Sequence, residues 1–378
     1  MKAAVLAGSV RSPFHFANKG ELTRVRPADL AAAVVKALIA RTGIDPKEIE
    51  DLLLGCAFPE GEQGLNVARL IDLIADLPQS VAGATINRFC GSSMQAVHSA
   101  AGAIALGAGD VFICAGVESM TRVPMMGFNP MPNPALNDRL PAAYISMGTT
   151  AENVARKYAI SREEQDAFAV ESQAKAASAR QAGKLKDEIV PIQNGKDTVS
   201  SDGCIREGTT LEALAGLKPA FDEHGVVTAG TSSPLTDGAA ACLVTSADYA
   251  KAHGLKPLAK VRSVAVAGCA PEIMGSGPCS ATQKARKRSG LTMDQIDVIE
   301  LNEAFAAQAL ACMRDLKSDP GKVNLDGGAI ALGHPLGATG ARITGKAAAL
   351  LKREGKQFAL STQCIGGGQG IATILETV

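Results

Sequence analysis

Tryptophan is absent from this chain of 378 residues, tyrosine occurs three times, and aromatic residues make up 3% of the total. Lysine plus arginine equals aspartate plus glutamate at 38 each, so the formal net charge is zero. A general nucleic-acid surface needs clustered basic residues and stacking aromatic rings, so none is indicated, although a local basic patch for a phosphorylated ligand stays open. No apolar run approaches the ~20 residues that a membrane-spanning helix requires.

Cysteine is present nine times, but no two cysteines form a C-x-x-C pair. An odd, scattered set of thiols indicates neither a disulfide framework nor a zinc site, and we expect no bound metal. Met1 to Val10 reads as a strand cut short by Arg11, without the apolar segment or cleavage site of a secretion signal. A reducing cytoplasm is the expected location.

Strand-like and helix-like patterns alternate along the first part of the chain. Hydrophobic residues make up 46% of the sequence, which favours a globular protein with a large core. We expect strands at Lys2–Gly8, Leu52–Ala57, Pro78–Ile86 and Val111–Gly116, and helices at Pro27–Gly43, Asn66–Ile74 and Cys90–Leu106. Such alternation is typical of an α/β layered domain with helices on the faces of a sheet.

Later segments indicate an insertion and then a second copy of this unit. Residues 118–237 contain a Pro- and Met-rich stretch at 123–141 and a capped helix from Ser161, and a strand pattern returns at 238–245. Further on, Gly43–Leu52 aligns without gaps on Gly290–Ile299. Two similar α/β units would form a cleft between them, where ligand sites tend to lie.

Cys90 lies where a predicted strand meets a predicted helix, in the stretch Asn87-Arg88-Phe89-Cys90-Gly91-Ser92-Ser93-Met94. Unpaired N–H groups and the positive end of the helix dipole at such an elbow favour a thiolate. Elbows of this kind hold nucleophiles in other enzymes. A buried cysteine that only fills space is the alternative interpretation of this residue.

Three further stretches place reactive or flexible groups at the ends of predicted strands. They are Asn302-Glu303-Ala304-Phe305, the glycine-rich loop Gly327 to Gly337 with His334, and Cys364-Ile365-Gly366-Gly367-Gly368-Gln369-Gly370. Loops at strand ends present functional groups on a rigid scaffold. His334 read alone is equally a hydrogen-bonded turn residue. The glycine run lacks a Walker lysine and the G-x-G-x-x-G spacing, so nucleotide binding is weakly indicated.

Taken together, the four stretches resemble motifs of the thiolase family, and the resemblance extends over essentially the whole chain. The matching segments read CGSSMQA, NEAFAAQ, GGAIALGHPLG and CIGGGQG. The resemblance implies the thiolase fold, an α/β fold of two similar βαβαβαββ halves that form a five-layered αβαβα core. Residues 1–250 would form the N-terminal half, with a loop domain inserted at about 118–237, and residues 251–378 the C-terminal half.

The resemblance also implies a reaction and the residues that perform it. Cys90 would attack the 3-keto carbon of a 3-ketoacyl-CoA, with His334 accepting its proton. Cys364 would protonate the departing acetyl-CoA enolate and later activate coenzyme A, which is a co-substrate rather than a bound cofactor. One oxyanion hole would consist of His334 and a water held by Asn302, and the other of the backbone N–H groups of Cys90 and Gly366.

Substrate contacts and chain-length class follow from weaker parts of the resemblance. Arg206 would lie near the adenine end of coenzyme A and Ser233 near its pantetheine. Members that form acetoacetyl-CoA have a histidine where this chain has Ser146. Together with Arg88-Phe89 and Ala213, this favours a broad-range 3-ketoacyl-CoA thiolase of fatty-acid β-oxidation.

Other functions stay open at this point. Within the family the alternative is a biosynthetic acetyl-CoA acetyltransferase. A ketoacyl synthase would have no use for Cys364, and a thiolase-like lipid-binding protein tends to lose catalytic groups that are all present here. The resemblance further implies a homodimer or homotetramer and leaves a hydratase/dehydrogenase partner open.

Overall fold

The computed structural model describes residues 2–378, and its centre is a ten-stranded mixed sheet. The strands follow the order β10-β11-β12-β9-β1-β8-β5-β3-β4, and β2 pairs with β8. The first half contains β1 (Ala4–Arg11), β2 (His15–Phe16), α1 (Pro27–Thr42), β3 (Asp51–Gly55), α2 (Val67–Ile74), β4 (Ala82–Ile86), α3 (Ser92–Leu106), β5 (Val111–Ser119) and β8 (Thr236–Ser246).

The second half repeats this strand order. It contains α8 (Ala247–Ala252), β9 (Ala259–Gly268), α9 (Gly277–Ser289), β10 (Val298–Leu301), α10 (Ala306–Leu316), α11 (Ala329–Leu332), α12 (Leu336–Glu354), β11 (Phe358–Ile365) and β12 (Gln369–Glu376). The order β4-β3-β5-β8-β1 corresponds to β10-β11-β12-β9 without an outer strand. The counterpart of β4 is reduced to one parallel bridge between Ile299 and Val323, so the second half is a shortened copy.

The aligned stretches of the sequence occupy equivalent places in the two halves. Gly43 and Gly290 end α1 and α9 in the left-handed conformation, at φ 70° and 75°. Each glycine leads through a short connection into the corresponding strand, β3 or β10. A left-handed helix end costs glycine nothing sterically, which explains why this residue recurs at both ends.

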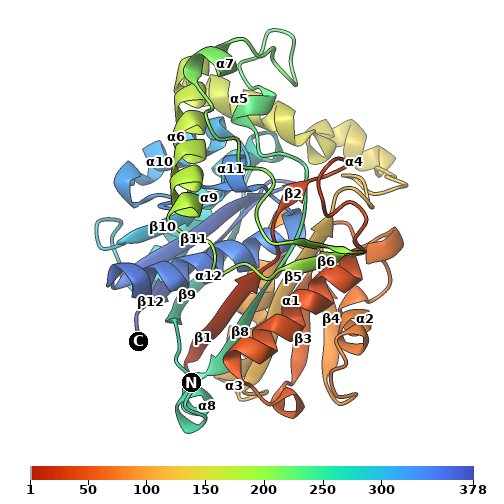
Figure 1. Cartoon of the computed structure of the whole chain (residues 1–378). Coiled ribbons are helices and arrows are strands. Elements are labelled where there is room, and N and C mark those ends of the chain that lie inside the picture. Colours follow the sequence, from red (N-terminus) through yellow and green to blue (C-terminus); the bar gives the residue numbers. More distant parts are fainter. Residues whose placement is uncertain (1) are drawn as a thin grey trace.

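The three largest apolar cores lie between five layers of helix and sheet, and the second of them fills both sides of the central helix layer. The first core packs α1 and α2 on the first half of the sheet, and the third packs α9 and α10 on the second half. Between them, α3 and α12 are buried against strands from both halves. Figure 1 shows the red-to-orange first half and the blue second half with these helices on their faces. The resulting order is the expected αβαβα.

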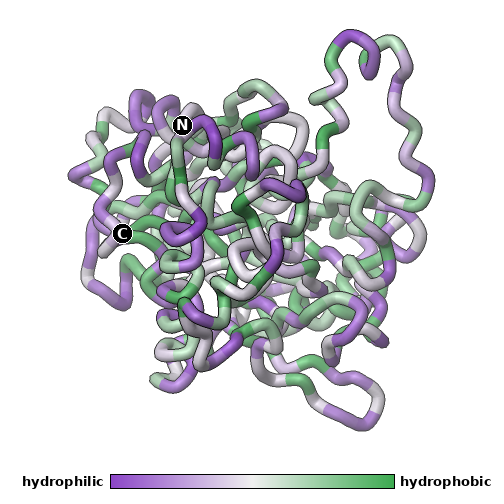
Figure 2. Tube along the Cα trace, turned by 90° about the horizontal axis from the view of Figure 1, so that it is seen from above, coloured by the Kyte–Doolittle hydropathy of each residue, from purple (hydrophilic) through white to green (hydrophobic). Residues whose placement is uncertain are grey.

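Within residues 2–378, two residue pairs join the halves through the sheet, Val5 with Lys260 and Leu6 with Ala259. Hydrophobic segments run through the middle of the molecule, and hydrophilic turns gather around its rim (Figure 2). No helix within residues 2–378 is both long and apolar enough to cross a membrane.

The helices of the segment between β5 and β8 lie in the upper part of Figure 1, and its strand β6 (Ile192–Asn194) lies lower, near β5 in this view. The segment contains α4 (Pro134–Arg139), α5 (Met147–Tyr158), α6 (Arg162–Gln181), β6, β7 (Asp197–Val199) and α7 (Leu211–Ala215). Its Pro- and Met-rich part is exposed, with Met131 at 82% and Phe128 at 59%, as the composition predicts. The short helix α4 within it was not expected.

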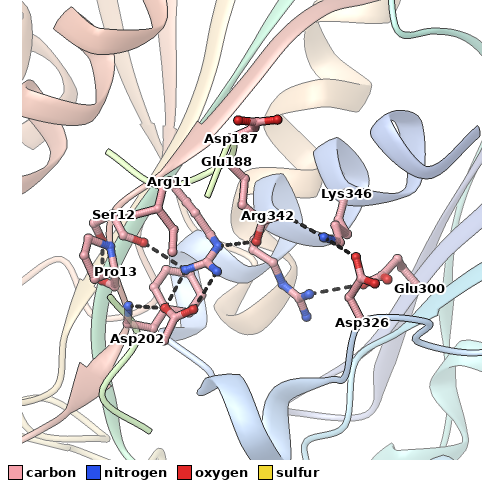
Figure 3. A network of polar contacts seen from close by, with 12 residues as sticks. Arg11, Ser12, Pro13, Asp187, Glu188, Asp202, Glu300, Asp326, Arg342 and Lys346 are labelled. Carbon is pink, nitrogen blue, oxygen red and sulfur yellow. Dashed lines mark hydrogen bonds and ion pairs between the residues drawn. The ribbon is translucent and has the colours of Figure 1, made fainter. Parts of the chain in front are cut away.

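Buried ion pairs tie this inserted segment to both halves (Figure 3). Arg11 of β1 donates to Asp202 at 2.6 and 2.8 Å and to Glu188 at 2.7 Å. Glu188 also pairs with Lys346 of α12 at 2.8 Å. Since Arg11, Asp202 and Lys346 are nearly inaccessible to solvent, these pairs fix how the three parts of the chain meet.

Candidate active site

Cys90 lies in a tight turn between β4 and α3. The helix begins at Ser92 rather than at Cys90, because Phe89 to Gly91 form a separate 3-10 turn. Phe89 has φ 43°, an uncommon value for a non-glycine residue. Its N–H donates to Asn87 Oδ1 at 2.8 Å, and Ser92 Oγ donates to its carbonyl at 2.6 Å. These bonds maintain the turn that presents the thiol.

The Cys90 thiol is neutral in this environment. Burial raises its pKa to about 11, while a backbone N–H of Gly366 acts in the opposite direction and the Glu118 carboxylate adds to the rise. Backbone N–H groups of Gly366 and Cys90 do lower the pKa of the thiol, as expected at such a turn, but burial outweighs them, so the resting thiol is not the predicted thiolate. Desolvation outweighs the partial charge of the helix end. A base is needed to take the proton.

His334 is held between α11 and α12 and hydrogen-bonded on both ring nitrogens. Its Nδ1 lies 2.6 Å from Thr339 Oγ1, and Asn302 Nδ2 lies 3.3 Å from its Nε2. Because the Thr339 hydroxyl donates to the Pro335 carbonyl at 3.2 Å, it accepts from Nδ1–H. We assign the tautomer with a free electron pair on Nε2 from this network.

Burial, assisted by the positive charge of Arg342, lowers the pKa of His334 to about 3. The imidazole is therefore neutral near pH 7, as a proton acceptor must be. Asn302 directly follows β10 and is fully buried, and its side-chain oxygen has no hydrogen-bond partner. A buried polar atom without a partner suits a ligand or an ordered water.

Cys364 and Gly366 lie at the end of β11. Cys364 is 1% exposed, and burial together with the nearby Cys90 raises the pKa of its thiol well above the usual range. Gly367 and Gly368 have φ 76° and 80°, so they are needed for the tight turn into β12. A Cβ at Gly366 would meet only ordinary contacts at 3.5 Å or more, so crowding does not by itself require glycine there.

One cavity of about 220 Å³ brings together Cys90, His334 and Cys364, with Ser233 and Ser146 also on its wall. Asn302 lies behind His334 and reaches the cavity through it. The two thiols and the imidazole thus share one cavity, although Cys90 is more than 240 positions away from the other two residues. Two thiols and a neutral imidazole in a desolvated cavity can perform nucleophilic acyl transfer.

A second cavity of about 570 Å³ adjoins the first and has a mostly apolar wall. Cys90, Met125, Met147 and Leu336 contribute to both cavities. The larger one also contains Gly366 and residues of the Pro- and Met-rich segment, including Met126, Pro130 and Met131.

The two predicted coenzyme A contacts differ in position. Ser233 lies on the cavity wall, where its N–H donates to the Ala304 carbonyl at 2.9 Å. Arg206 lines neither cavity, and its backbone N–H bonds to Gln173 of α6. Its Nε is buried without a partner.

Sequence reasoning missed two residues that touch the predicted groups and a third that lies close to them. Gln363 donates to the Cys90 carbonyl, Thr339 orients His334, and the Glu118 carboxylate lies among the loops around the site. Glu118 could have been noticed, since it interrupts the apolar strand VFICAGVES with an acidic residue. The other two lie in ordinary strand and helix sequence that contains no such signal.

The five-layered core and the paired thiols are features of a class of enzymes that transfer acyl groups. Residues 4–248 match the thiolase N-terminal domain, and residues 255–377 match the thiolase C-terminal domain. The chain belongs to the thiolase family.

Relatives match over the full length. A 3-ketoacyl-CoA thiolase of Bacillus subtilis is 49% identical, with 100% of both chains covered. One from Acinetobacter baylyi is 50% identical over 99% of this chain and 98% of the relative. The crystal structure of the Bacillus anthracis acetyl-CoA acetyltransferase superposes with a TM-score of 0.92 at 40% identity, covering 100% of this chain and 99% of that one.

Proposed function

We propose that the chain is a 3-ketoacyl-CoA thiolase, an acyltransferase that cleaves a 3-ketoacyl-CoA with coenzyme A into acetyl-CoA and a shortened acyl-CoA. The observation that carries this proposal is the shared cavity of Cys90, His334 and Cys364. Full-length identity of 49–50% with proteins named 3-ketoacyl-CoA thiolase supports the same reaction. Degradation of fatty acids by β-oxidation is the corresponding role.

In the first half-reaction, the Cys90 sulfur attacks the 3-keto carbon while its proton moves to Nε2 of His334. The bond between C2 and C3 then breaks, and its electron pair leaves as the enolate of acetyl-CoA. Cys364 gives its proton to C2 of that enolate. An acyl group remains on Cys90 as a thioester.

In the second half-reaction, coenzyme A releases the acyl group. The Cys364 thiolate takes the proton of the coenzyme A thiol, whose sulfur attacks the thioester carbon. The Cys90 sulfur leaves and recovers a proton from His334. Each group thus returns to its starting protonation state, so no permanently bound cofactor is required.

Two sets of donors would stabilise the oxygen anions that form. Protonated His334 and a water held by Asn302 serve the first anion, and the N–H groups of Cys90 and Gly366 serve the second. Preorganised donors of this kind contribute ~3–4 kcal/mol each to lowering a barrier. The partnerless Oδ1 of Asn302, beside His334, supports the first set as an acceptor for that water. The action of the Gly366 N–H on Cys90 supports the second.

Coenzyme A would enter along Ser233, which shares the small cavity with both thiols. Arg206 would contact the phosphate-bearing adenine end, where loss of the guanidinium should raise KM for coenzyme A more than it lowers kcat.

The acyl tail would occupy the larger cavity beside Cys90. Its volume of about 570 Å³ falls within the ~300–1,000 Å³ typical of small-molecule sites. Methionines at 125, 126, 131 and 147 line it, and flexible thioether side chains adapt to ligands of different shape. This wall supports a broad range of chain lengths over strict selectivity for acetoacetyl-CoA.

A profile of kcat/KM against 3-ketoacyl-CoA length from C4 to C16 tests the substrate range. Comparable activity on 3-ketohexadecanoyl-CoA and acetoacetyl-CoA is expected. Strict C4 activity would instead establish the alternative, an acetyl-CoA acetyltransferase that forms acetoacetyl-CoA. Replacing Cys90 with alanine should abolish activity at every length and serves as the blank.

Self-association and location are further parts of the proposal. β4 is an edge strand, and the neighbouring Leu65, Leu70, Leu73 and Ile74 are exposed at 40–88%. An open edge beside apolar side chains suits pairing with a second copy, as a homodimer or as half of a homotetramer. Nine free thiols suit a reducing cytoplasm. Light scattering would give the oligomer size and any association with a hydratase/dehydrogenase.

A further inference from the structure

Glu118 is a carboxylate buried near the end of β5, at 1% exposure, with only hydrogen-bond donors around it. Oε2 accepts from the N–H groups of Ala57 at 2.8 Å and Gly337 at 2.9 Å. Oε1 accepts from Phe58 N–H at 3.3 Å and Gln63 Nε2 at 2.9 Å. Among the residues that the structure describes, no cation is within ion-pair distance of it.

These partners belong to different halves of the chain. Ala57 and Phe58 follow β3 in the first half and line the apolar cavity beside Cys90. Gly337 is in the first turn of α12 in the second half, three residues after His334. A single carboxylate therefore joins the wall of the acyl cavity to the helix that directly follows the base.

At Gly337 the first turn of α12 lies so close to β3 and β5 that its position must be held accurately. A Cβ on Gly337 would lie 2.8 Å from the Gly55 and Val117 carbonyl oxygens. A Cβ on Gly116 would lie 2.1 Å from the Gly337 carbonyl. The end of α12 thus abuts β3 and β5 directly, and the negative charge of Glu118 stabilises the positive end of that helix.

Only a group that accepts on both oxygens fits this position. The orientation of Gln63 is fixed, because its Oε1 accepts from the Ser119 N–H at 2.6 Å while its Nε2 donates to Glu118. A glutamine at 118 would turn its NH2 either toward Ala57 and Gly337 or toward Phe58 and Gln63. Either orientation sets donor against donor and loses hydrogen bonds on one wall.

We propose that Glu118 is a positioning residue for the thiolase reaction, which holds the His334 segment at a fixed distance from Cys90 and the acyl cavity. The proposal rests on the proposed function. Glu118 does not touch the reacting atoms. It acts through the Ala57–Phe58 segment and the first turn of α12, and its charge opposes ionisation of Cys90 in the resting site.

The test compares Glu118→Gln and Glu118→Asp with Asp297→Asn. Asp297 also accepts backbone N–H groups, those of Gln357 and Phe358 at 3.0 Å each, but at the opposite end of β10 from Asn302. For Glu118→Gln we expect kcat to fall ~100-fold, because a misplacement of ~1 Å costs about that much, with KM near the parent value. Asp297→Asn should keep both constants.

A second readout separates charge from geometry. Alkylation of Cys90 by iodoacetamide, followed against pH by mass spectrometry, should have its midpoint at lower pH in Glu118→Gln than in the parent. Glu118→Asp keeps the charge but is one methylene shorter, so it should keep the alkylation midpoint and still lose kcat.

An unchanged kcat in Glu118→Gln, or in Glu118→Asp if the glutamine variant does not fold, would overturn the positioning role. An unchanged alkylation midpoint in folded Glu118→Gln would overturn the charge effect. If the parent cleaves no 3-ketoacyl-CoA, the proposed function fails instead, while the alkylation profiles still report on Glu118.

Discussion

His334 and Cys90 are both neutral in the resting site, so Cys90 must lose its proton before or during attack on the substrate. With a pKa of about 11, Cys90 is ionised in only ~10⁻⁴ of molecules at pH 7. Ionising it without assistance costs about 5 kcal/mol, at ~1.36 kcal/mol per pH unit. Burial lowers the pKa of His334 to about 3, so the ring is neutral, but a separate thiolate–imidazolium pair formed before attack is unfavourable. Proton transfer should therefore accompany attack on the substrate.

Replacing His334 with asparagine removes the proton acceptor and keeps a polar side chain. We expect the rate of Cys90 acylation to fall ~10²–10⁴-fold at pH 7, the usual contribution of a general base. The residual rate should then follow the thiolate fraction and rise about tenfold per pH unit from pH 7 to 9. The parent enzyme should show no such slope, because His334 supplies the acceptor throughout.

Rapid-quench mixing with a 3-ketoacyl-CoA, with acylated protein counted by mass spectrometry, measures this rate. His98→Asn is a matched control, since burial also lowers the pKa of His98 to about 3, and the ring bonds to Thr373 away from both cavities. The control should acylate like the parent. Near-parent acylation by His334→Asn, or a flat pH profile in that variant, would refute the assignment of the base.

Three further changes probe the second half-reaction and the buried charges. Cys364→Ala should still acylate Cys90 but lose ~10²–10⁴-fold in steady-state turnover, and a near-parent kcat would contradict its role. Asp202→Ala leaves Arg11 buried with one acceptor residue fewer, so calorimetry should show a loss of ~3–5 kcal/mol, and an unchanged Tm would contradict this. Glu188 has its pKa lowered to about 2, because two buried cations outweigh the opposing effect of burial. Its stabilisation is present above about pH 4.5 and lost as pH falls toward 2, so in urea unfolding from pH 6 to 3 Glu188→Gln should lose less stability than the parent.

The order of strands and helices could be predicted because local patterns determine it. Glycine at the ends of α1 and α9 revealed the duplication, since the left-handed helix end favours this residue wherever it occurs. The reduction of the β4 counterpart in the second half to a single bridge could not be predicted. Its remnant at Val323 has the same apolar character as a strand residue, and only pairing with Ile299 shows how short it is.

The charge state of the site lay beyond sequence reasoning for a different reason. The strand-to-helix turn at Cys90 was visible, and so was the helix end that favours a thiolate. How deeply the thiol is buried depends on segments far along the chain, such as Gly366, and that burial reverses the direction of the pKa shift. Glu118 was missed likewise, since its partner Gly337 is 219 positions away.

Trapping the acyl group is the most direct test of whether Cys90 forms the covalent intermediate. The protein is mixed with a 3-ketoacyl-CoA in the absence of coenzyme A, quenched in acid and digested, and the peptides are analysed by mass spectrometry. We expect the acyl group, shortened by two carbons, on the peptide that contains Cys90, and none in the Cys90→Ala variant. An acyl group on Cys364 instead, or turnover without any adduct, would contradict this expectation.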